Sequence, residues 1–224
     1  MDKNGIDYLG LGCVLKRGSG EVLEDREDVL FIRDNVSGAY MLACEEEDTG
    51  LEILERYSDR GYTLLMVSDP GLGNIAFQKY GFHERIVCYQ VAYYGEKPAI
   101  DTSLTFRIAG ENDLPMILEH YHLISPEELK SVIERGSLIL GYEKETPVGF
   151  IGEHLEGSMG LLQVFPEFRK RGYGAALQKY LIARTMERGD IPFGQVEKEN
   201  RISLNLQKKI GMTKSDRLIM WMWK

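Results

Sequence analysis

The stretch that decides the fold is Arg169-Lys170-Arg171-Gly172-Tyr173-Gly174-Ala175-Ala176-Leu177. An apolar run from Leu161 to Phe165 precedes it, and a helical pattern of apolar residues follows it to about Arg188. The sequence therefore predicts a strand, a basic turn with two glycines, and the N-terminus of a helix. Free backbone N–H groups and the helix dipole at such a turn favour bound anions, and glycine lets a ligand approach the backbone closely.

The spacing of this turn excludes two common phosphate-binding motifs. It lacks the third glycine of a dinucleotide fingerprint, and no Gly-Lys-Ser/Thr follows as a Walker loop requires. The turn alone leaves one further interpretation open, which is a solvated basic connection between a strand and a helix.

Two segments resemble the signatures of the GNAT acyltransferases. Arg169-x-x-Gly172-x-Gly174 is similar to that family's pyrophosphate-binding loop, and Val164-Phe165-Pro166-Glu167-Phe168-Arg169 to its lead-in. Downstream, Asn200, Ser203, Leu206 and Gly211 match the second signature, with Met212 in place of its phenylalanine and Gln207 in place of its tyrosine. The resemblance covers roughly residues 104–224 and implies an acyl-CoA site.

The elements predicted around these motifs have the same order as in that family. Strands are expected at 104–108, 137–142, 148–154 and 191–196. Helices are expected after Asn112-Asp113, after the N-cap Ser125 with Pro126 at the first helical position, at 172–188, and at 200–212.

The first half of the chain looks like a second, degenerate copy. Strands are expected at 29–33, 39–43, 63–67 and 85–94, with a helix at 51–57 and a helix-Gly-Phe ending at 74–82. Acidic residues occupy 45–48, where the basic turn is expected, and they would repel pyrophosphate. An unrelated α/β domain is the alternative for this half.

We therefore predict an α/β (α+β) chain of tandem GNAT-like domains, each a mixed, mostly antiparallel sheet flanked by helices. Residues 1–98 form the degenerate copy and residues 99–224 the acyl-CoA-binding domain, with 95–98 as the linker.

Charge and composition narrow the class of partner. Residues 1–98 contain 10 Lys and Arg against 18 Asp and Glu, a net of −8, whereas residues 99–224 contain 17 of each. We expect no nucleic-acid partner for a chain of this charge. Three cysteines in apolar, strand-like runs (Cys13, Cys44, Cys88) are interpreted as reduced core thiols, and no metal site is expected. Without a signal peptide or a long apolar run, a cytoplasmic protein without membrane contact is expected.

The resemblance implies a set of residues that bind the acyl-CoA co-substrate, acetyl-CoA in the simplest case. In that family the pantetheine arm lies where the fourth strand separates from the fifth, and a backbone N–H of strand four, here Val164 or nearby, serves the oxyanion. The implied co-substrate contacts are Gln163, Val164, Phe165, Arg169, Lys170, Arg171, Gly172, Tyr173, Gly174, Ala175, Asn200 and Ser203.

The catalytic residues are less well marked. An alkyl ammonium has a pKa near 10, so a base must take its proton before the amine attacks. Ser158 stands where that family often has a carboxylate, and Gln207 replaces its acid. Glu153, His154 and Glu156 lie nearby; strand alternation sends Glu153 and His154 to opposite faces, and Glu153 is the favoured base. The predicted catalytic set is Glu153, His154 and Ser158.

The sequence therefore predicts an acyl-CoA-dependent N-acyltransferase that acts on a small amine or amino acid by direct transfer in a ternary complex. The two-part chain also resembles the glycine N-acyltransferase group. The acidic first half should attract a cationic acceptor. Two alternatives stay open: a non-catalytic acyl-CoA-binding protein whose acidic half mediates contacts, and a protein-lysine acetyltransferase. The oligomeric state is not encoded in any motif.

Overall fold

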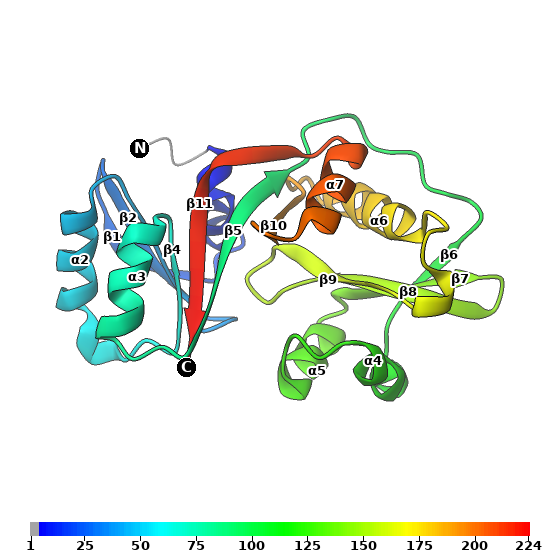
Figure 1. The fold of residues 1–224 in the computed structure, drawn as a ribbon, viewed down its shortest axis with the longest axis horizontal. Coiled ribbons are helices and arrows are strands. Elements are labelled where there is room, and N and C mark those ends of the chain that lie inside the picture. The colour runs from blue at the N-terminus through cyan, green and yellow to red at the C-terminus, as the bar shows by residue number, and fades with distance from the viewer. Residues whose placement is uncertain (1–4) are drawn as a thin grey trace. The chain divides into compact units, whose positions relative to one another are not determined.

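The computed structural model describes residues 5–224, whose helices and strands Figure 1 labels. The chain forms two compact units. Unit 1 contains the residues up to Val91 together with Gln195–Leu204 and Lys214–Lys224, and unit 2 contains Ala92–Gly194 and Asn205–Thr213.

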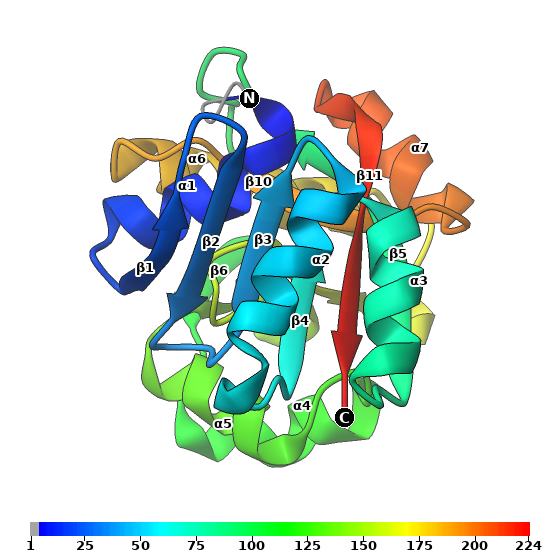
Figure 2. The same cartoon turned by 90° about the vertical axis from the view of Figure 1, so that its left-hand side faces the viewer.

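Unit 1 is a mixed sheet with helices on both faces. Its strands follow the order β1-β2-β3-β4-β11-β5, and β3 and β4 are parallel. Helices α2 and α3 cover one face and α1 covers the other (Figure 2). The elements are η1 (Ile6–Tyr8), α1 (Leu9–Lys16), β1 (Gly20–Asp25), β2 (Val29–Asp34), β3 (Tyr40–Cys44), α2 (Glu47–Arg56), η2 (Ser58–Arg60), β4 (Leu64–Val67), α3 (Pro70–Lys79), β5 (Glu84–Ala92) and β11 (Thr213–Trp223).

The central strands of unit 1 are apolar on both faces because each face has its own helical layer. Phe31 and Leu42 pack with α2 and α3, whereas their neighbours Ile32 and Met41 pack with α1. Successive side chains of a strand point to opposite faces, so continuous apolar runs such as 29–32 form two cores at once.

The sequence did not predict α1 or β1, and it placed Cys13 in a strand-like run, which is wrong. Cys13 lies in helix α1, whereas Cys44 and Cys88 lie in β3 and β5. Leu11 and Val14, three residues apart, are fully buried on one side of this short helix. A helix of two turns contains too few apolar residues for its 3.6-residue period to be distinguished from the alternation of a strand.

The strands of unit 2 follow the order β10-β9-β8-β7-β6, parallel between β10 and β9 and antiparallel elsewhere. Helix α6 lies on one face, and α4 and α5 lie on the other (Figure 1). The elements are β6 (Thr105–Ile108), η3 (Glu111–Asp113), α4 (Leu114–His120), α5 (Pro126–Glu134), β7 (Leu138–Glu143), β8 (Thr146–Glu153), β9 (Met159–Val164), η4 (Pro166–Phe168), α6 (Tyr173–Glu187), β10 (Phe193–Glu197) and α7 (Arg201–Ile210).

Helix ends in the C-terminal half follow the predicted capping residues, with one difference. Ser125 Oγ accepts the amide of Glu128 at 3.1 Å, and α7 ends at Gly211, whose φ is +91°. The Asp113 side chain, expected as an N-cap, instead accepts bonds from Arg107 and from the amide of Gly110. The ion pair with Arg107 takes its carboxylate away from α4.

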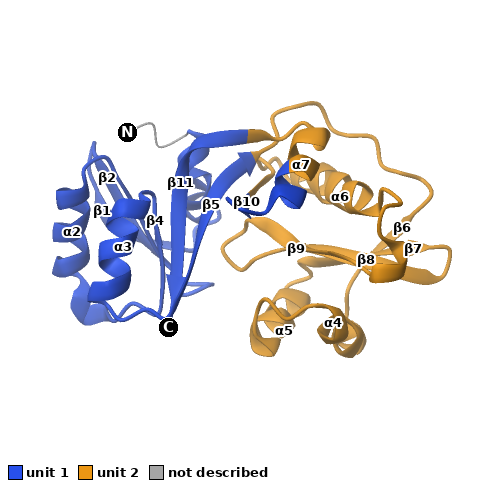
Figure 3. Ribbon diagram, in the orientation of Figure 1, with its two compact units in different colours: residues 1–91, 195–204, 214–224 blue, residues 92–194, 205–213 orange. Residues whose placement is uncertain are grey.

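The two compact units are not contiguous in sequence. The C-terminal strand β11 is antiparallel to β4 of the first half, with Met220 opposite Val67, so it belongs to unit 1 (Figure 3). The division expected at residue 98 kept the C-terminal strand in the second half of the chain. A single sequence does not show which strands pair, so it could not assign β11 to unit 1. Strand β10 contributes residues to both units.

Within residues 5–224, no helix is both long enough and apolar enough to cross a bilayer.

Because β11 belongs to unit 1, we predict that residues 1–98 do not fold stably alone. The fragment would lose Ile219, Met220, Trp221 and Met222, all buried in the cores of unit 1. Each such side chain contributes about 1.5–3 kcal/mol, which together approaches the 5–15 kcal/mol typical of a domain. Circular dichroism melts of the fragment should show no cooperative transition, with the full chain as control. A fragment that melts cooperatively near the full-length transition would contradict the strand exchange.

Candidate functional site

The predicted strand, basic turn and helix are present. Strand β9 ends at Val164, the single turn η4 follows, and α6 begins directly after Gly172. Lys170 and Gly172 both have left-handed backbone, with φ of +64° and +88°. Nothing lies within 4 Å of where a Cβ on Gly172 would be, so backbone conformation and not space makes glycine favourable there.

Three side chains at this turn have partners on neighbouring elements of unit 2. Arg169 Nε donates to the carbonyl of Val164 at 3.1 Å, and Arg171 lies 3.8 Å from the carboxylate of Glu143. The buried Tyr173 donates its hydroxyl hydrogen bond to the same carboxylate. The first N–H groups of α6 have no intrahelical acceptor, so they face outward as anion donors among three exposed cations.

Strands β9 and β10 are parallel where they meet within unit 2. Their register pairs Gly194 with Met159. A Cβ on Gly194 would lie 2.6 Å from the carbonyl oxygen of Met159, so only glycine permits this contact. The expected pantetheine site along β9 from Gly160 to Val164 stays a prediction.

A β-bulge lies just beyond this contact. Phe150 on β8 faces Gln163 and Gly152 faces Gly160, so β9 has one residue more than its partner over this span. Leu161 carries the distortion with φ of +53° and is buried. A bulge leaves its extra residue outside the ladder, which frees a backbone N–H at the point where the strands separate.

The corresponding pair in unit 1 is closed. Strands β3 and β4 pair in parallel at Tyr40, Met41 and Leu42, and the ladder continues from the amide of Ser68 to the carbonyl of Leu42 at 2.9 Å. The segment 45–48 between β3 and α2 is acidic, as the sequence indicated. Unit 1 therefore has neither the gap nor the basic turn of unit 2.

The strand residues predicted to bind the pantetheine arm differ in how far their side chains are buried. The ring of Phe165 is buried and stacks on His120 at 4.1 Å, and its amide donates to Val148. Gln163 and Val164 are half-buried. The side chain of Phe165 thus belongs to the core beneath α4.

Asn200 and Ser203 form the N-terminal cap of α7. Asn200 Oδ1 accepts the amide of Ser203 at 3.0 Å, and both residues lie in the part of the chain assigned to unit 1. Their expected place beside the pantetheine arm stays a prediction.

Glu153, the favoured base, is held in an ion pair. Its Oε1 accepts bonds from Arg188 and, at 3.2 Å, from Thr185 Oγ1, both at the C-terminal end of α6. Only 13% of its side chain is exposed. Strand alternation correctly separates Glu153 from His154, because Glu153 contacts α6 whereas His154 contacts α5 on the opposite face.

His154 lies in a cluster that the sequence identified only in part. Its Nδ1 is 4.0 Å from Oε1 of Glu128 on α5, and its amide donates to the carbonyl of Ser158 at 2.9 Å. The buried Ser158 hydroxyl donates to the carboxylate of Glu156, which is also buried. Burial alone lowers the pKa of His154, but the Glu128 carboxylate and the charge of Glu156 outweigh it and raise that pKa above its ordinary value.

The sequence did not indicate Glu128 as a site residue. It lies 26 positions before His154, and a carboxylate is common in the first turn of a helix. No spacing rule brings an α5 residue to the end of β8. Gly160, which makes room for the His154 ring, likewise carried no signal.

Gln207, which stands in place of the family's tyrosine, has a structural partner. Gln207 and Gln178 exchange two hydrogen bonds of 3.0 and 3.1 Å between α7 and α6, and both are buried. In this pair each amide donates one hydrogen bond and accepts one.

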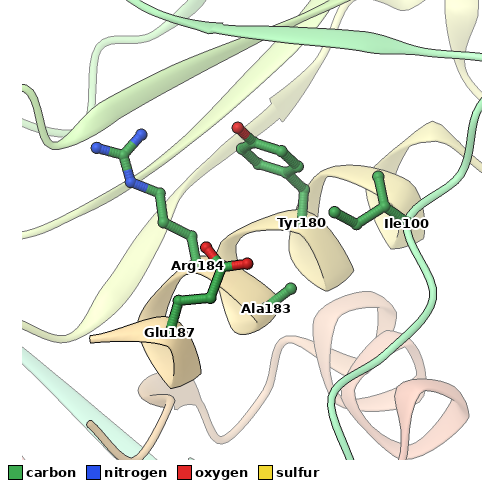
Figure 4. Close-up of a pocket in the computed structure, with 5 residues that line it drawn as sticks. All are labelled: Ile100, Tyr180, Ala183, Arg184 and Glu187. Atoms are coloured by element: carbon green, nitrogen blue, oxygen red, sulfur yellow. The ribbon is translucent and has the colours of Figure 1, made fainter. Parts of the chain in front are cut away.

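Helix α6 also borders an open hollow of about 340 Å³. It is lined by Ile100, Tyr180, Ala183, Arg184 and Glu187 (Figure 4). It contains none of the predicted site residues.

Comparison with known proteins agrees with this fold. Residues 141–222, which include the turn, α6 and α7, match the family of FR47-like proteins. No curated protein is significantly similar to the chain in sequence.

Solved structures resemble nearly the whole chain. A Drosophila structural-genomics protein superposes with a TM-score of 0.66 at 16% identity, covering 98% of this chain and 90% of its own. A putative GNAT-family acetyltransferase from Novosphingobium aromaticivorans gives 0.56 at 16% identity, covering 96% and 94%. A GCN5-related N-acetyltransferase from Kribbella flavida gives 0.59 at 10%, covering 97% and 94%. The chain therefore has a mixed α/β fold of the GNAT type.

The amide pair predicts non-additive stability changes. Gln207→Leu should lower the free energy of unfolding by about 1–3 kcal/mol, because it leaves the buried Gln178 amide without a partner. The double variant Gln178→Leu/Gln207→Leu should recover most of that loss, since two apolar side chains replace two paired amides. Urea denaturation of the wild type, both single variants and the double variant measures this cycle. Additive losses would mean that the two amides do not stabilise one another.

Proposed function

We propose that the protein is an acyl-CoA-dependent N-acyltransferase, with acetyl-CoA as the simplest co-substrate and a small amine or amino acid as acceptor. The observation that carries the proposal is the segment of unit 2 in which β9, with its bulge, leads through a basic turn to the N-terminus of α6. The shared GNAT fold and the FR47-like match support it.

The residues of unit 2 suit a CoA ester at each of its parts. The turn from Arg169 to Gly174 offers cations and helix N–H groups to a pyrophosphate, and the exposed edge of β9 offers backbone groups to the amide-containing pantetheine arm. The bulge at Leu161 interrupts the ladder with β8, and the proposal assigns a backbone N–H of this part of β9 to the oxyanion. Bound acetyl-CoA would supply an activated acyl group as a thioester.

Direct transfer to the acceptor is favoured over an acyl-enzyme. Residues 99–224 contain no cysteine. Burial, followed by the Asp69 charge, raises the pKa of the Cys44 thiol to about 11, and burial raises the pKa of the Cys88 thiol to about 12. Thiols with such pKa values stay protonated at neutral pH, and the thiolate is the nucleophile.

Unit 1 is proposed to be a degenerate GNAT-like copy without acyl-CoA. Its order β3-α2-β4-α3-β5 repeats the order β9-α6-β10-α7-β11, and in each case the first two strands are parallel. Its closed β3–β4 ladder and acidic 45–48 segment leave no place for the co-substrate. The excess of carboxylates in the first half favours a cationic acceptor over an anionic one.

One observation favours a second candidate, a non-catalytic acyl-CoA-binding protein. Gln207 stands where the family has its acid, and its amide is engaged by Gln178. A panel of primary amines and amino acids with acetyl-CoA separates the two functions, because only a transferase releases free CoA thiol in proportion to acceptor.

The first prediction from this proposal concerns Gly172. Gly172→Glu should abolish acetyl-CoA binding, because it places a carboxylate and an unfavourable φ of +88° at the proposed pyrophosphate site. Isothermal titration calorimetry measures the binding, and thiol release measures turnover.

The matched control is Gly189→Glu at the other end of the same helix. Gly189 is also left-handed, with φ of +77° and open space around it. This control should bind acetyl-CoA normally. Normal binding by Gly172→Glu would place the co-substrate elsewhere.

The second prediction concerns the chemical route. A chain with Cys13, Cys44 and Cys88 all replaced by alanine should keep the wild-type kcat, apart from losses due to reduced stability, because no cysteine carries the acyl group. Intact-protein mass spectrometry after mixing with acetyl-CoA should show no stable acyl adduct. A competent adduct that forms and decays at the turnover rate would refute direct transfer.

A further inference from the structure

We propose that His154 is the catalytic base that takes the proton from the acceptor amine, and that Glu128 is the positioning residue that orients its ring. The inference rests on the proposed acyltransferase function and assigns the acceptor side of that site. It also names the class of acceptor, a primary amine that arrives as an ammonium ion.

The first support is the place of the His154 ring. A Cβ on Gly160 would lie 2.5 Å from Nε2 and 2.7 Å from Cδ2 of His154, so the ring lies over the backbone of β9 in space that only glycine leaves open. Gly160 directly follows Met159, where β9 and β10 make their single register contact, and directly precedes the bulge at Leu161. The imidazole therefore lies over β9 beside this contact and beside the bulge, next to the proposed oxyanion donor.

The second support is the orientation of the ring. Nδ1 faces the Glu128 carboxylate, which favours the tautomer with its proton on Nδ1. Nε2 then carries the lone pair and faces β9. A carboxylate behind an imidazole sets the direction from which the ring accepts a proton, and it stabilises the imidazolium that results.

The third support is the charge of the cluster. The charged groups that face His154 are Glu128 from α5 and Glu156 from the β8–β9 turn. Within residues 5–224, neither carboxylate forms an ion pair with lysine or arginine. Two carboxylates without a lysine or arginine partner complement an ammonium ion and disfavour an anionic acceptor.

Glu153 is less suited to this role. Arg188 and Thr185 already bind its carboxylate on the α6 side of the sheet, whereas His154 is on the α5 side. Taking a proton from the acceptor would require Glu153 to give up its ion pair.

The step balances as a transfer from sulfur to nitrogen. The ammonium proton passes to Nε2 of His154, the bond from the amine nitrogen to the acyl carbon forms, and the carbon–sulfur bond breaks. The cationic nitrogen then gives its second proton to the thiolate, and the imidazolium releases its proton to water, which leaves an amide, free CoA thiol and a neutral imidazole.

The test compares two histidines of unit 2 in the full chain. His154→Gln should lower kcat about 10²- to 10⁴-fold with the best amine of the panel, the usual contribution of a general base, while the calorimetric Kd for acetyl-CoA stays unchanged. His122→Gln makes the same change at an exposed histidine and should keep the wild-type kcat.

The pH profile separates catalysis from folding. His154 must be neutral to accept a proton, so kcat/KM should fall as pH drops through its pKa, which lies above the ordinary value near 6.5. Glu128→Gln removes a charge that raises this pKa, so the acidic limb should move to lower pH. In His154→Gln the limb should disappear, with partial recovery at high pH where the free amine is present.

Gly160→Ala provides an independent variant. The added methyl group would occupy the position of the imidazole edge, which is the movable end of a side chain, so the chain should fold and bind acetyl-CoA while kcat falls.

The outcomes distinguish this inference from the proposed function. Wild-type protein that binds no acetyl-CoA, or releases no CoA with any amine, overturns both. Active wild type with a parallel pH profile in His154→Gln overturns the inference alone. An acidic limb that Glu153→Gln removes and His154→Gln keeps makes Glu153 the base.

Discussion

The single contact between Met159 and Gly194 is the constraint on which the site depends. Parallel strands joined by a helix normally continue their ladder, but β9 and β10 pair only once, and β9 then bulges at Leu161. The left-handed Gly172 then starts α6. The contact, the bulge and the helix N-terminus therefore lie along one strand–turn–helix segment, which explains why one short stretch of sequence identifies the fold.

Unit 1 shows what happens when that constraint is absent. Its β3–β4 pair keeps the ladder through Leu42 and Ser68, and two apolar cores fill both faces of the sheet. The same order of elements therefore gives a closed, packed unit. The proposed acyl-CoA site therefore depends on the bulge and the basic helix N-terminus of unit 2 and not on the order of elements, which both units share.

Two polar pairs explain how unit 2 departs from the family pattern. Gln207 braces α7 against α6 through Gln178, so the position of the expected acid contributes to packing. Glu153 is likewise bound to α6 through Arg188. The polar groups left beside the bulge of β9 are His154 and its carboxylate neighbours, which is why we propose the catalytic base there.

Local sequence determined the basic turn, the N-cap Ser125, the glycine end of α7 and most strands. These features depend on residues a few positions apart, and capping and turn preferences act over that range. The tertiary structure decided the rest. Pairing of β11 with β4, the approach of Glu128 to His154, the room over Gly160 and the left-handed Leu161 all depend on residues distant in the chain. Side-chain function at this site follows from packing across elements, and no local pattern encodes which faces will meet.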